Sequence, residues 1–291
     1  MAKVLVTGAS GFIGNYVVTE LLQRGYEVIA SSASAEKAAA FQWFKRVRYI
    51  PLNLAAVEDA VNYYKYFDAP DAVIHLAWEG LPNYNAAFHS QVNLPRHLSF
   101  LSNLVQNGLV NLTVTGTCFE YGMQQGRLDE SMPAQPANPY AQAKDTLRKM
   151  LQQLQQQYPF HLKWVRLFYM YGKGQNPKSL LSQLQLALDE KQEVFNMSGG
   201  EQVRDYLPVE KVAHNIVSIA LQNSVEGIIN CCSGQPVTVK QLIDNYLQQQ
   251  GAGIRLNLGY YPYTDYEPMA FWGDTKKLQS IFKQANEETG L

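Results

Sequence analysis

The stretch "TGASGFIG", Thr7 to Gly14, decides the fold class of this 291-residue chain. It follows the β-branched run "KVLVTG" (3–8) and opens an amphipathic segment, "FIGNYVVTELLQRG" (12–25). Glycines with GxxGxxG spacing let the backbone turn tightly and approach a pyrophosphate, whose charge then lies at the helix N-terminus. Between the first strand and the first helix of a chain, this motif predicts a dinucleotide-binding unit.

Outward from this turn, strand and helix signals alternate. Strand-like runs occupy 26–31, 47–52, 71–78 and 110–116, and helical patterns lie near 35–45, 55–66 and 86–107. Such alternation predicts a parallel sheet built from right-handed crossovers. After "HLKWVRLF" (161–168) the pattern breaks into segments rich in Gly, Pro and Tyr, with helices near 178–190, 208–222 and 238–250 and a further strand in 226–234. We therefore predict an α/β fold with a second, smaller lobe.

Composition limits the classes of partner. Hydrophobic residues make up 46% of the chain, and 24 basic against 25 acidic residues give a net charge of −1. This balance favours neither a nucleic-acid nor a membrane surface. The N-terminus runs directly into a strand-like segment, so we expect no signal peptide, and no apolar stretch approaches the length of a membrane span. Three cysteines cannot form a disulfide framework. A soluble cytoplasmic protein is expected.

A second motif, "YAQAK", carries candidate acid–base chemistry. Tyr140 and Lys144 are four residues apart at the start of a helical pattern, so both side chains lie on one face. An ammonium group near a phenol favours the phenolate and lowers its pKa. A Tyr and a Lys one turn apart are common in ordinary helices, but here they follow a dinucleotide-binding turn.

With these motifs in this order, the chain resembles the extended short-chain dehydrogenase/reductase family. "TGASGFIG", "VIHLAW", "TGTCFEYG", "NPYAQAK", "RLFYMYGKG" and "RDYLPVEKVA" follow the family's order over nearly the whole length. The resemblance implies a Rossmann-type, doubly wound parallel sheet over 1–166, to which 205–235 returns. It implies a mixed C-terminal lobe for a sugar nucleotide over 167–204 and 236–291. It also implies that Tyr140 exchanges a proton with the sugar oxygen, Lys144 holds the nicotinamide ribose, and Thr117, in place of the more usual Ser, hydrogen-bonds the same oxygen.

The resemblance also implies an NAD(P) site. Its expected residues are Gly8, Ser10, Gly11, Phe12, Ile13, Gly14, Ser31, Ser32, Asn53, Leu54, Leu76, Ala77, Trp78, Thr115, Tyr140 and Lys144. An acidic residue usually ends the second strand and repels a 2′-phosphate, but here the strand ends in "ASSAS". Because hydroxyls there can accommodate a phosphate, with Lys37 or Arg46 nearby, we predict a preference for NADP(H), with NAD(H) as the alternative.

The residues after Thr117 limit the reaction. Dehydratases of the family have an Asp and a Glu at the positions of Cys118 and Phe119, and epimerase–reductases have a Cys at the position of Phe119. Hydride transfer with proton transfer through Tyr140 remains. Further stretches, such as "RLFYMYGKGQNPKSL" and "EPMAFWGDTKKL", resemble reductases of nucleotide-linked 4-keto-6-deoxyhexoses, including those that make dTDP-fucose for polysaccharide or O-antigen. CDP-abequose synthases are near neighbours.

Two other functions stay open: a redox-neutral 4-epimerase that retains NAD, and a non-catalytic NAD(P) sensor, against which the intact Thr117, Tyr140 and Lys144 argue.

The substrate lobe carries its own candidates. Arg204 matches the family's phosphate-binding arginine, although a salt bridge with Asp205 or Glu201 is an alternative. Lys178 and Ser179 open a helix and could add phosphate contacts. Tyr169 stands where many relatives have a substrate-facing Asn, and buried structural roles are expected for Glu120 and His75. In relatives the helices near 86–107 and 139–157 pair as a four-helix bundle, which predicts a homodimer.

Overall fold

The computed structural model describes residues 2–265 and 267–289, and a seven-stranded parallel sheet forms its centre. In spatial order its strands are β11 (Gly227–Cys231), β7 (His161–Leu167), β5 (Asn111–Thr117), β4 (Ala72–His75), β1 (Lys3–Thr7), β2 (Glu27–Ser31) and β3 (Arg48–Tyr49). The chain builds β1 to β3 towards one edge and then returns to β4 on the other side of β1. This reversal opens a crevice at the carboxyl ends of the strands, where α/β sheets bind ligands. The predicted α/β, Rossmann-type fold is confirmed.

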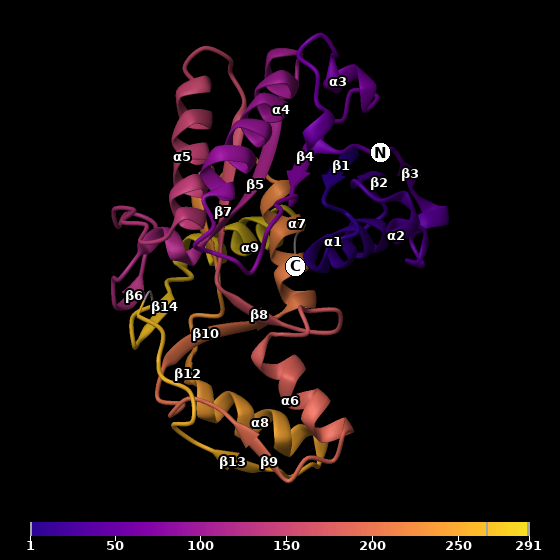
Figure 1. Ribbon diagram of the computed structural model, residues 1–291. Coiled ribbons are helices and arrows are strands. Elements are labelled where there is room, and N and C mark those ends of the chain that lie inside the picture. The colour runs from indigo at the N-terminus through magenta and orange to yellow at the C-terminus, as the bar shows by residue number, and fades with distance from the viewer. Residues whose placement is uncertain (1, 266, 290–291) are drawn as a thin grey trace.

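Helices cover both faces of the sheet (Figure 1). On one face α1 (Phe12–Gln23), α7 (Val209–Ala220) and α9 (Lys276–Thr289) contribute to a core that also contains Val4, Val6 and Ile229. On the other face α3 (Tyr63–Tyr66), α4 (Leu94–Gln106) and α5 (Pro139–Leu154) cover Leu5, Val73 and Leu112. Residues next to each other along a strand therefore serve opposite layers, as a buried parallel sheet requires.

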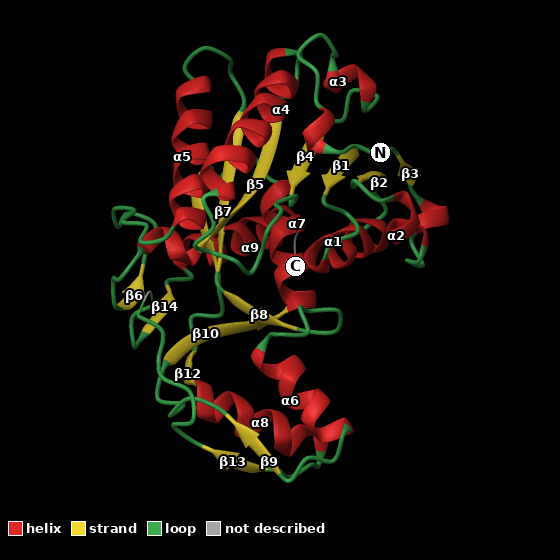
Figure 2. Ribbon diagram, in the orientation of Figure 1, coloured by secondary structure: helices red, strands yellow, loops and turns green. Residues whose placement is uncertain are grey.

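A smaller lobe lies below the carboxyl ends of the strands (Figure 2). Its three-stranded sheet has the order β12 (Pro236–Thr238), β10 (Val203–Pro208), β8 (Tyr169–Tyr171). The helices α6 (Leu180–Asp189) and α8 (Val239–Gln250) share a separate core with the pair β9 (Val194–Asn196) and β13 (Arg255–Asn257). A last pair, β6 (Gly126–Leu128) and β14 (Phe271–Gly273), joins segments far apart in the sequence.

Three segments differ from the sequence predictions. The helix expected near 35–45 is α2 (Ala35–Ala39), because Phe41 and Trp43 stack and turn into the core instead. The helix expected near 55–66 is a 3-10 turn at 54–56 and the short α3, whose start is capped by the Asn62 side chain. In addition, α9 packs against α7 and β11, so this segment lies beside the Rossmann part and not in the lobe predicted for 236–291.

The helix expected near 86–107 begins as a π-helical turn, His89–Asn93, and continues as α4. Pro95, which has no backbone N–H, lies directly after the π-helical turn, at the start of α4. The helices α4 and α5 lie side by side on one face (Figure 1), and the homodimer through them stays a prediction.

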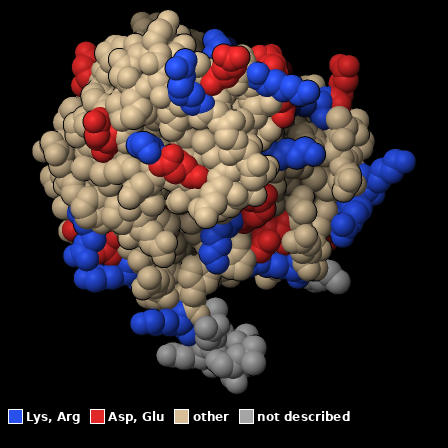
Figure 3. Space-filling model, turned by 90° about the horizontal axis from the view of Figure 1, so that it is seen from below, with Lys and Arg blue, Asp and Glu red and all other residues tan. Residues whose placement is uncertain are grey.

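Acidic and basic side chains are interspersed on the face shown in Figure 3. Within the described ranges, no helix has both the length and the apolar character to cross a membrane.

Candidate active site

The glycine turn between β1 and α1 is shaped by contacts with the neighbouring strand. Gly8 has a φ of +70°, and a β-carbon there would lie 2.7 Å from the backbone nitrogen of Ala77. Gly14 packs against the backbone of Gly8 and Ala9, so a side chain at this position has no room. No side chain caps the start of α1, whose N-cap is Gly11. The turn therefore offers free helix N–H groups to an anion, as a dinucleotide pyrophosphate requires.

A cavity of about 290 Å³ lies beside this turn at the end of β2. The predicted residues that line it include Ser10, Ser31, Ser32, Leu54, Leu76 and Ala77. Asn53 was also predicted to bind the cofactor but does not line this cavity. Asn53 is exposed, and its side chain caps the next 3-10 turn by accepting from the backbone N–H of Ala55.

Hydroxyl groups and cations dominate the polar surface of this corner. The Ser10 hydroxyl donates to Ser32 Oγ (2.9 Å), which also lies 2.9 Å from the Tyr49 hydroxyl. Lys37 and Arg96 line the cavity, together with one carboxylate, Glu79, which lies 4.0 Å from Arg96. No carboxylate among the described lining residues comes from the end of β2. The volume and the polar lining of this corner fit an adenosine ribose.

A second cavity of about 400 Å³ adjoins the first and shares Gly8, Gly11, Leu76 and Trp78 with it. Three predicted catalytic residues, Thr117, Tyr140 and Lys144, line it together. Four further predicted cofactor residues, Phe12, Ile13, Gly14 and Thr115, also line it, as does Tyr169. The fold thus brings nearly all the predicted cofactor residues and the catalytic three to one continuous cleft.

The start of α5 positions Tyr140 and Lys144. Pro139 occupies the first turn, and the Asn138 side chain accepts from the backbone N–H of Ala141, which fixes where the helix begins. Lys144 is 2% exposed, and its ammonium donates to the carbonyl of Thr115 (2.9 Å). Burial lowers the pKa of Lys144 to about 7.

Burial raises the pKa of Tyr140, and the hydrogen bond with the Thr117 side chain opposes this only in part. After burial, the neighbouring Tyr84, Glu120 and Cys118 raise the pKa further, while the Lys144 ammonium donates to the Thr115 carbonyl. The prediction that Lys144 lowers the Tyr140 pKa is therefore wrong for the protein on its own. Tyr140 is a protonated acid at neutral pH.

Thr117 ends β5 and is held by Glu120. Its hydroxyl accepts from the backbone N–H of Phe119 (3.3 Å), while Glu120 accepts from the backbone N–H of Thr117 (2.9 Å). Glu120 also accepts from Trp164 Nε1 and pairs with Arg166 (2.8 Å), and both members of this ion pair are fully buried. Glu120 thus has the buried structural role predicted for it. His75 also has the buried structural role predicted for it, because its ring lies between Thr7 and His97. Burial lowers the pKa of His75 to about 3.

The sequence predicted that Trp78 lines the cofactor site, but it did not predict the contacts that place Trp78 at the centre of the catalytic residues. Its ring centroid lies 4.0 Å from Lys144 Nζ, and its ring stacks on His97 at 4.5 Å. The indole N–H donates to His89 Nδ1 (3.1 Å), and the ring meets Tyr140 edge to face at 6.0 Å. The sequence signal was an aromatic residue at the carboxyl end of a buried strand, "VIHLAW".

The acids needed for dehydration are absent from the described lining of the catalytic cavity. No Asp, Glu or His lines it, and its titratable groups are Tyr84, Cys118, Tyr140, Lys144 and Tyr169. Cys118 is 5% exposed and packs with Tyr121 and Phe168, and burial raises the pKa of its thiol. The cavity can therefore donate a proton from Tyr140 but holds no carboxylate to act as a second base.

The predicted phosphate contacts are not gathered at this cleft. Arg204 is 2% exposed and pairs with Glu267 (2.9 Å), not with Asp205 or Glu201 as considered from sequence. Its Nη1 donates to the carbonyls of Val203 and Met269. Lys178 and Ser179 do not line the catalytic cavity. The Ser179 hydroxyl donates to the Ser182 hydroxyl in α6. Tyr169 lines it and donates to Glu267 (2.6 Å).

Comparisons with known proteins agree with this architecture. A dTDP-6-deoxy-L-talose 4-dehydrogenase (NAD(+)) of Aggregatibacter actinomycetemcomitans is 30% identical over 93% of this chain and 99% of the relative. A GDP-6-deoxy-D-talose 4-dehydrogenase of the same organism is 26% identical over 96% and 90%. Among solved structures, a UDP-N-acetylglucosamine 4-epimerase of Methanobrevibacter ruminantium M1 superposes with a TM-score of 0.85 at 21% identity, covering 96% and 91% of the chains.

A family model carries the assignment further. The model of the NAD dependent epimerase/dehydratase family matches residues 4–232, which include the glycine turn, Thr117, Tyr140 and Lys144. The chain belongs to the NAD-dependent epimerase/dehydratase family.

Proposed function

We propose that the protein reduces the 4-keto group of a nucleotide-linked 4-keto-6-deoxyhexose to a hydroxyl. One observation carries the proposal: the catalytic cavity contains Thr117, Tyr140 and Lys144 and, among its described lining residues, no Asp, Glu or His. Such a site supports a single proton transfer beside hydride transfer and lacks the groups for dehydration.

Each catalytic residue has a distinct role in this proposal. A bound nicotinamide would supply the hydride. As charge develops on the sugar oxygen, Tyr140 donates its proton to that oxygen and Thr117 donates a hydrogen bond to it. Lys144 would leave the Thr115 carbonyl in part to donate to the nicotinamide ribose, and its ammonium would then stabilise the phenolate that Tyr140 becomes.

The substrate class is supported by the wall of the cavity and by the names of relatives. Leu81, Pro82, Phe119 and Met170 give an apolar surface, which suits the methyl group of a 6-deoxysugar better than a hydroxymethyl group. Two relatives are named as 4-dehydrogenases of nucleotide-linked 6-deoxytaloses, and a 4-dehydrogenase runs 4-keto reduction in reverse. We propose a dTDP sugar: either dTDP-4-dehydro-6-deoxyglucose, which gives dTDP-fucose, or the 4-keto form of dTDP-6-deoxy-L-talose.

The direct test is a substrate screen. Purified protein is mixed with dTDP-, CDP- and GDP-linked 4-keto-6-deoxyhexoses, and the loss of NADPH or NADH absorbance is followed. We expect turnover with a dTDP sugar. Tight NADPH binding without turnover of any of these sugars would contradict the proposal and favour a sensor of NAD(P).

The cofactor is proposed to be NADP(H), because Lys37 and Arg96 line the ribose corner and β2 ends without a carboxylate. Ser32→Asp places a negative charge there and should lower kcat/KM for NADPH at least about tenfold more than for NADH. Ser32→Asn is the neutral control and should change the ratio little. A wild type that prefers NADH by kcat/KM, as the name of the NAD(+)-dependent relative suggests for that protein, would contradict this assignment.

Trp78 is expected to stabilise the charged form of Lys144 through its ring face. Trp78→Leu keeps apolar bulk and removes the ring, so the pKa of Lys144 should fall further below about 7. If reduction requires the ammonium, the alkaline limb of the kcat/KM profile then moves to lower pH. Trp78→Phe should move it less. An unchanged limb in Trp78→Leu would mean that the ring only fills space.

A second candidate is a 4-epimerase, because 4-epimerases occur among the relatives and the solved structures. An epimerase performs the same hydride transfer twice and retains NAD. Freshly purified protein discriminates the two: an epimerase carries NAD and converts a 4-hydroxy sugar without added cofactor, whereas a reductase consumes NADPH.

A further inference from the structure

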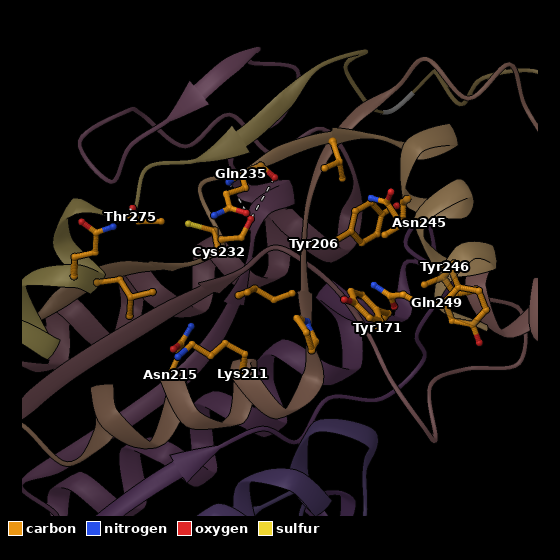
Figure 4. Close-up of a pocket in the computed structure, with 18 of the residues that line it drawn as sticks. Tyr171, Tyr206, Lys211, Asn215, Cys232, Gln235, Asn245, Tyr246, Gln249 and Thr275 are labelled. Atoms are coloured by element: carbon orange, nitrogen blue, oxygen red, sulfur yellow. Dashed lines mark hydrogen bonds between the residues drawn. The ribbon is translucent and has the colours of Figure 1, made fainter. Parts of the chain in front are cut away.

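A third cavity, of about 540 Å³, lies between the two lobes on the side of α7 and α9. Its walls come from α7, α8, α9, β10 and the loop after β11, and Figure 4 shows its lining side chains. It shares no lining residue with the cofactor corner or the catalytic cavity. The volume is in the range of small-molecule sites.

The floor of this cavity holds a polar atom without a partner. Asn215, on α7, is 2% exposed and lines the cavity. Its Oδ1 has no hydrogen-bond partner among the described residues, and its Nδ2 contacts only Cys231 Sγ at 3.8 Å. Buried side-chain oxygens are rarely left unsatisfied, since desolvation then costs free energy without return. The oxygen has almost no accessible surface, so a ligand hydroxyl or N–H can satisfy it once the Asn215 amide rotates toward the cavity.

A cation lies one helical turn away. Lys211 precedes Asn215 by four residues on α7, so both side chains face the cavity, as Figure 4 shows. Lys211 is the one charged side chain among the described lining residues, and its ammonium lies 5.8 Å from the centroid of the Phe282 ring. With no carboxylate in the lining, the cavity favours a ligand with one anionic group.

Neutral polar groups surround the rest of the cavity. Gln235, Asn245, Gln249 and Gln279 carry amides, and Tyr171 and Tyr206 add aromatic rings with hydroxyls. Amides both donate and accept, so they suit a ligand with several hydroxyls, while rings pack against the C–H faces of a sugar. The four amides and the one cation together fit a sugar with one phosphate better than an apolar molecule or one with several anionic groups.

We propose that this cavity is a second binding site, which takes a sugar monophosphate. The phosphate pairs with Lys211, a sugar hydroxyl donates to Asn215 Oδ1, and the amides contact the remaining hydroxyls. The proposal does not depend on the reaction at Tyr140, because the two sites share no residue.

Isothermal titration of the full-length protein with glucose 1-phosphate, glucose and inorganic phosphate tests the proposal. We expect glucose 1-phosphate to bind at least about tenfold more tightly than either fragment, because only it engages both Lys211 and Asn215. Lys211→Gln and Asn215→Leu should each weaken its binding by about fivefold or more. Asn215→Leu removes an unsatisfied oxygen, so the thermal unfolding midpoint should not fall.

Two control variants locate the binding. Lys65→Gln makes the same charge change on exposed α3 and should bind as the wild type does. Tyr140→Phe should also bind normally, and a loss there would place the ligand in the catalytic cavity and overturn the proposal. Three other results would overturn the proposal. One is that the wild type shows no binding at millimolar glucose 1-phosphate, and another is that inorganic phosphate binds as tightly as glucose 1-phosphate. The third result is that Lys211→Gln and Asn215→Leu bind glucose 1-phosphate as the wild type does.

Discussion

Tyr140→Phe should lower kcat for 4-keto reduction by about 10²-fold or more while NADPH binding persists. The substitution removes the hydroxyl that donates the proton and keeps the ring that packs against Trp78 and Tyr84. Because Tyr140 is buried and its pKa is raised, the wild-type phenol stays protonated through neutral pH and is available as an acid. The measurement is kcat and KM for the keto sugar, with the dissociation constant of NADPH from titration.

Thr117→Val is the matched comparison. It removes one donor to the oxyanion and leaves the acid, so its effect on kcat should be smaller than that of Tyr140→Phe. Wild-type rates in Tyr140→Phe would refute the mechanism, and an equal loss in both variants would contradict the smaller role assigned to Thr117.

Glu120→Ala should lower the free energy of unfolding by about 3–5 kcal/mol, as is typical when one member of a buried ion pair is removed. The change leaves Arg166 as an uncompensated buried cation and removes the acceptor for Trp164 Nε1 and for the backbone N–H of Thr117. Glu120→Gln keeps the shape and one oxygen acceptor, so it should cost less. Urea unfolding at constant pH gives the three values.

The exposed pair of Lys240 and Asp244 provides the control. Asp244→Ala should change the free energy of unfolding by less than about 1 kcal/mol, because surface pairs are screened by solvent. If Glu120→Ala instead abolished activity and left stability unchanged, Glu120 would be a catalytic residue.

The fold could be predicted from the sequence because its signals are local. A glycine turn after the first strand and alternating apolar segments determine a doubly wound sheet. Segments whose structure depends on distant contacts were less predictable. The helix expected near 35–45 is short because Phe41 and Trp43 pack into a core that forms only in the folded chain, and α9 returns to α7 and β11 through contacts that no local pattern reveals.

The catalytic three could be predicted because "YAQAK" and the end of β5 place them at fixed positions of regular elements. The partners of these residues could not. Lys144 lies against Trp78 and Thr115 through contacts between separate elements. Arg204 was assigned to phosphate by its motif, but its guanidinium pairs with Glu267, a residue 63 positions away. A motif indicates which residue type is present, whereas its partners follow from tertiary packing.

The central claim is that hydride is delivered to C4 of a keto sugar. Incubation of the protein with a dTDP-4-keto-6-deoxyhexose and NADPH deuterated at C4 of the nicotinamide tests it most directly, with the product analysed by NMR and mass spectrometry. We predict one deuterium at C4 of the 6-deoxyhexose for each deuteride transferred, with stoichiometric oxidation of the cofactor. Cofactor that stays reduced in the presence of every 4-keto-6-deoxyhexose tried, or cofactor oxidation with no deuterium at C4 of the sugar, would contradict the account.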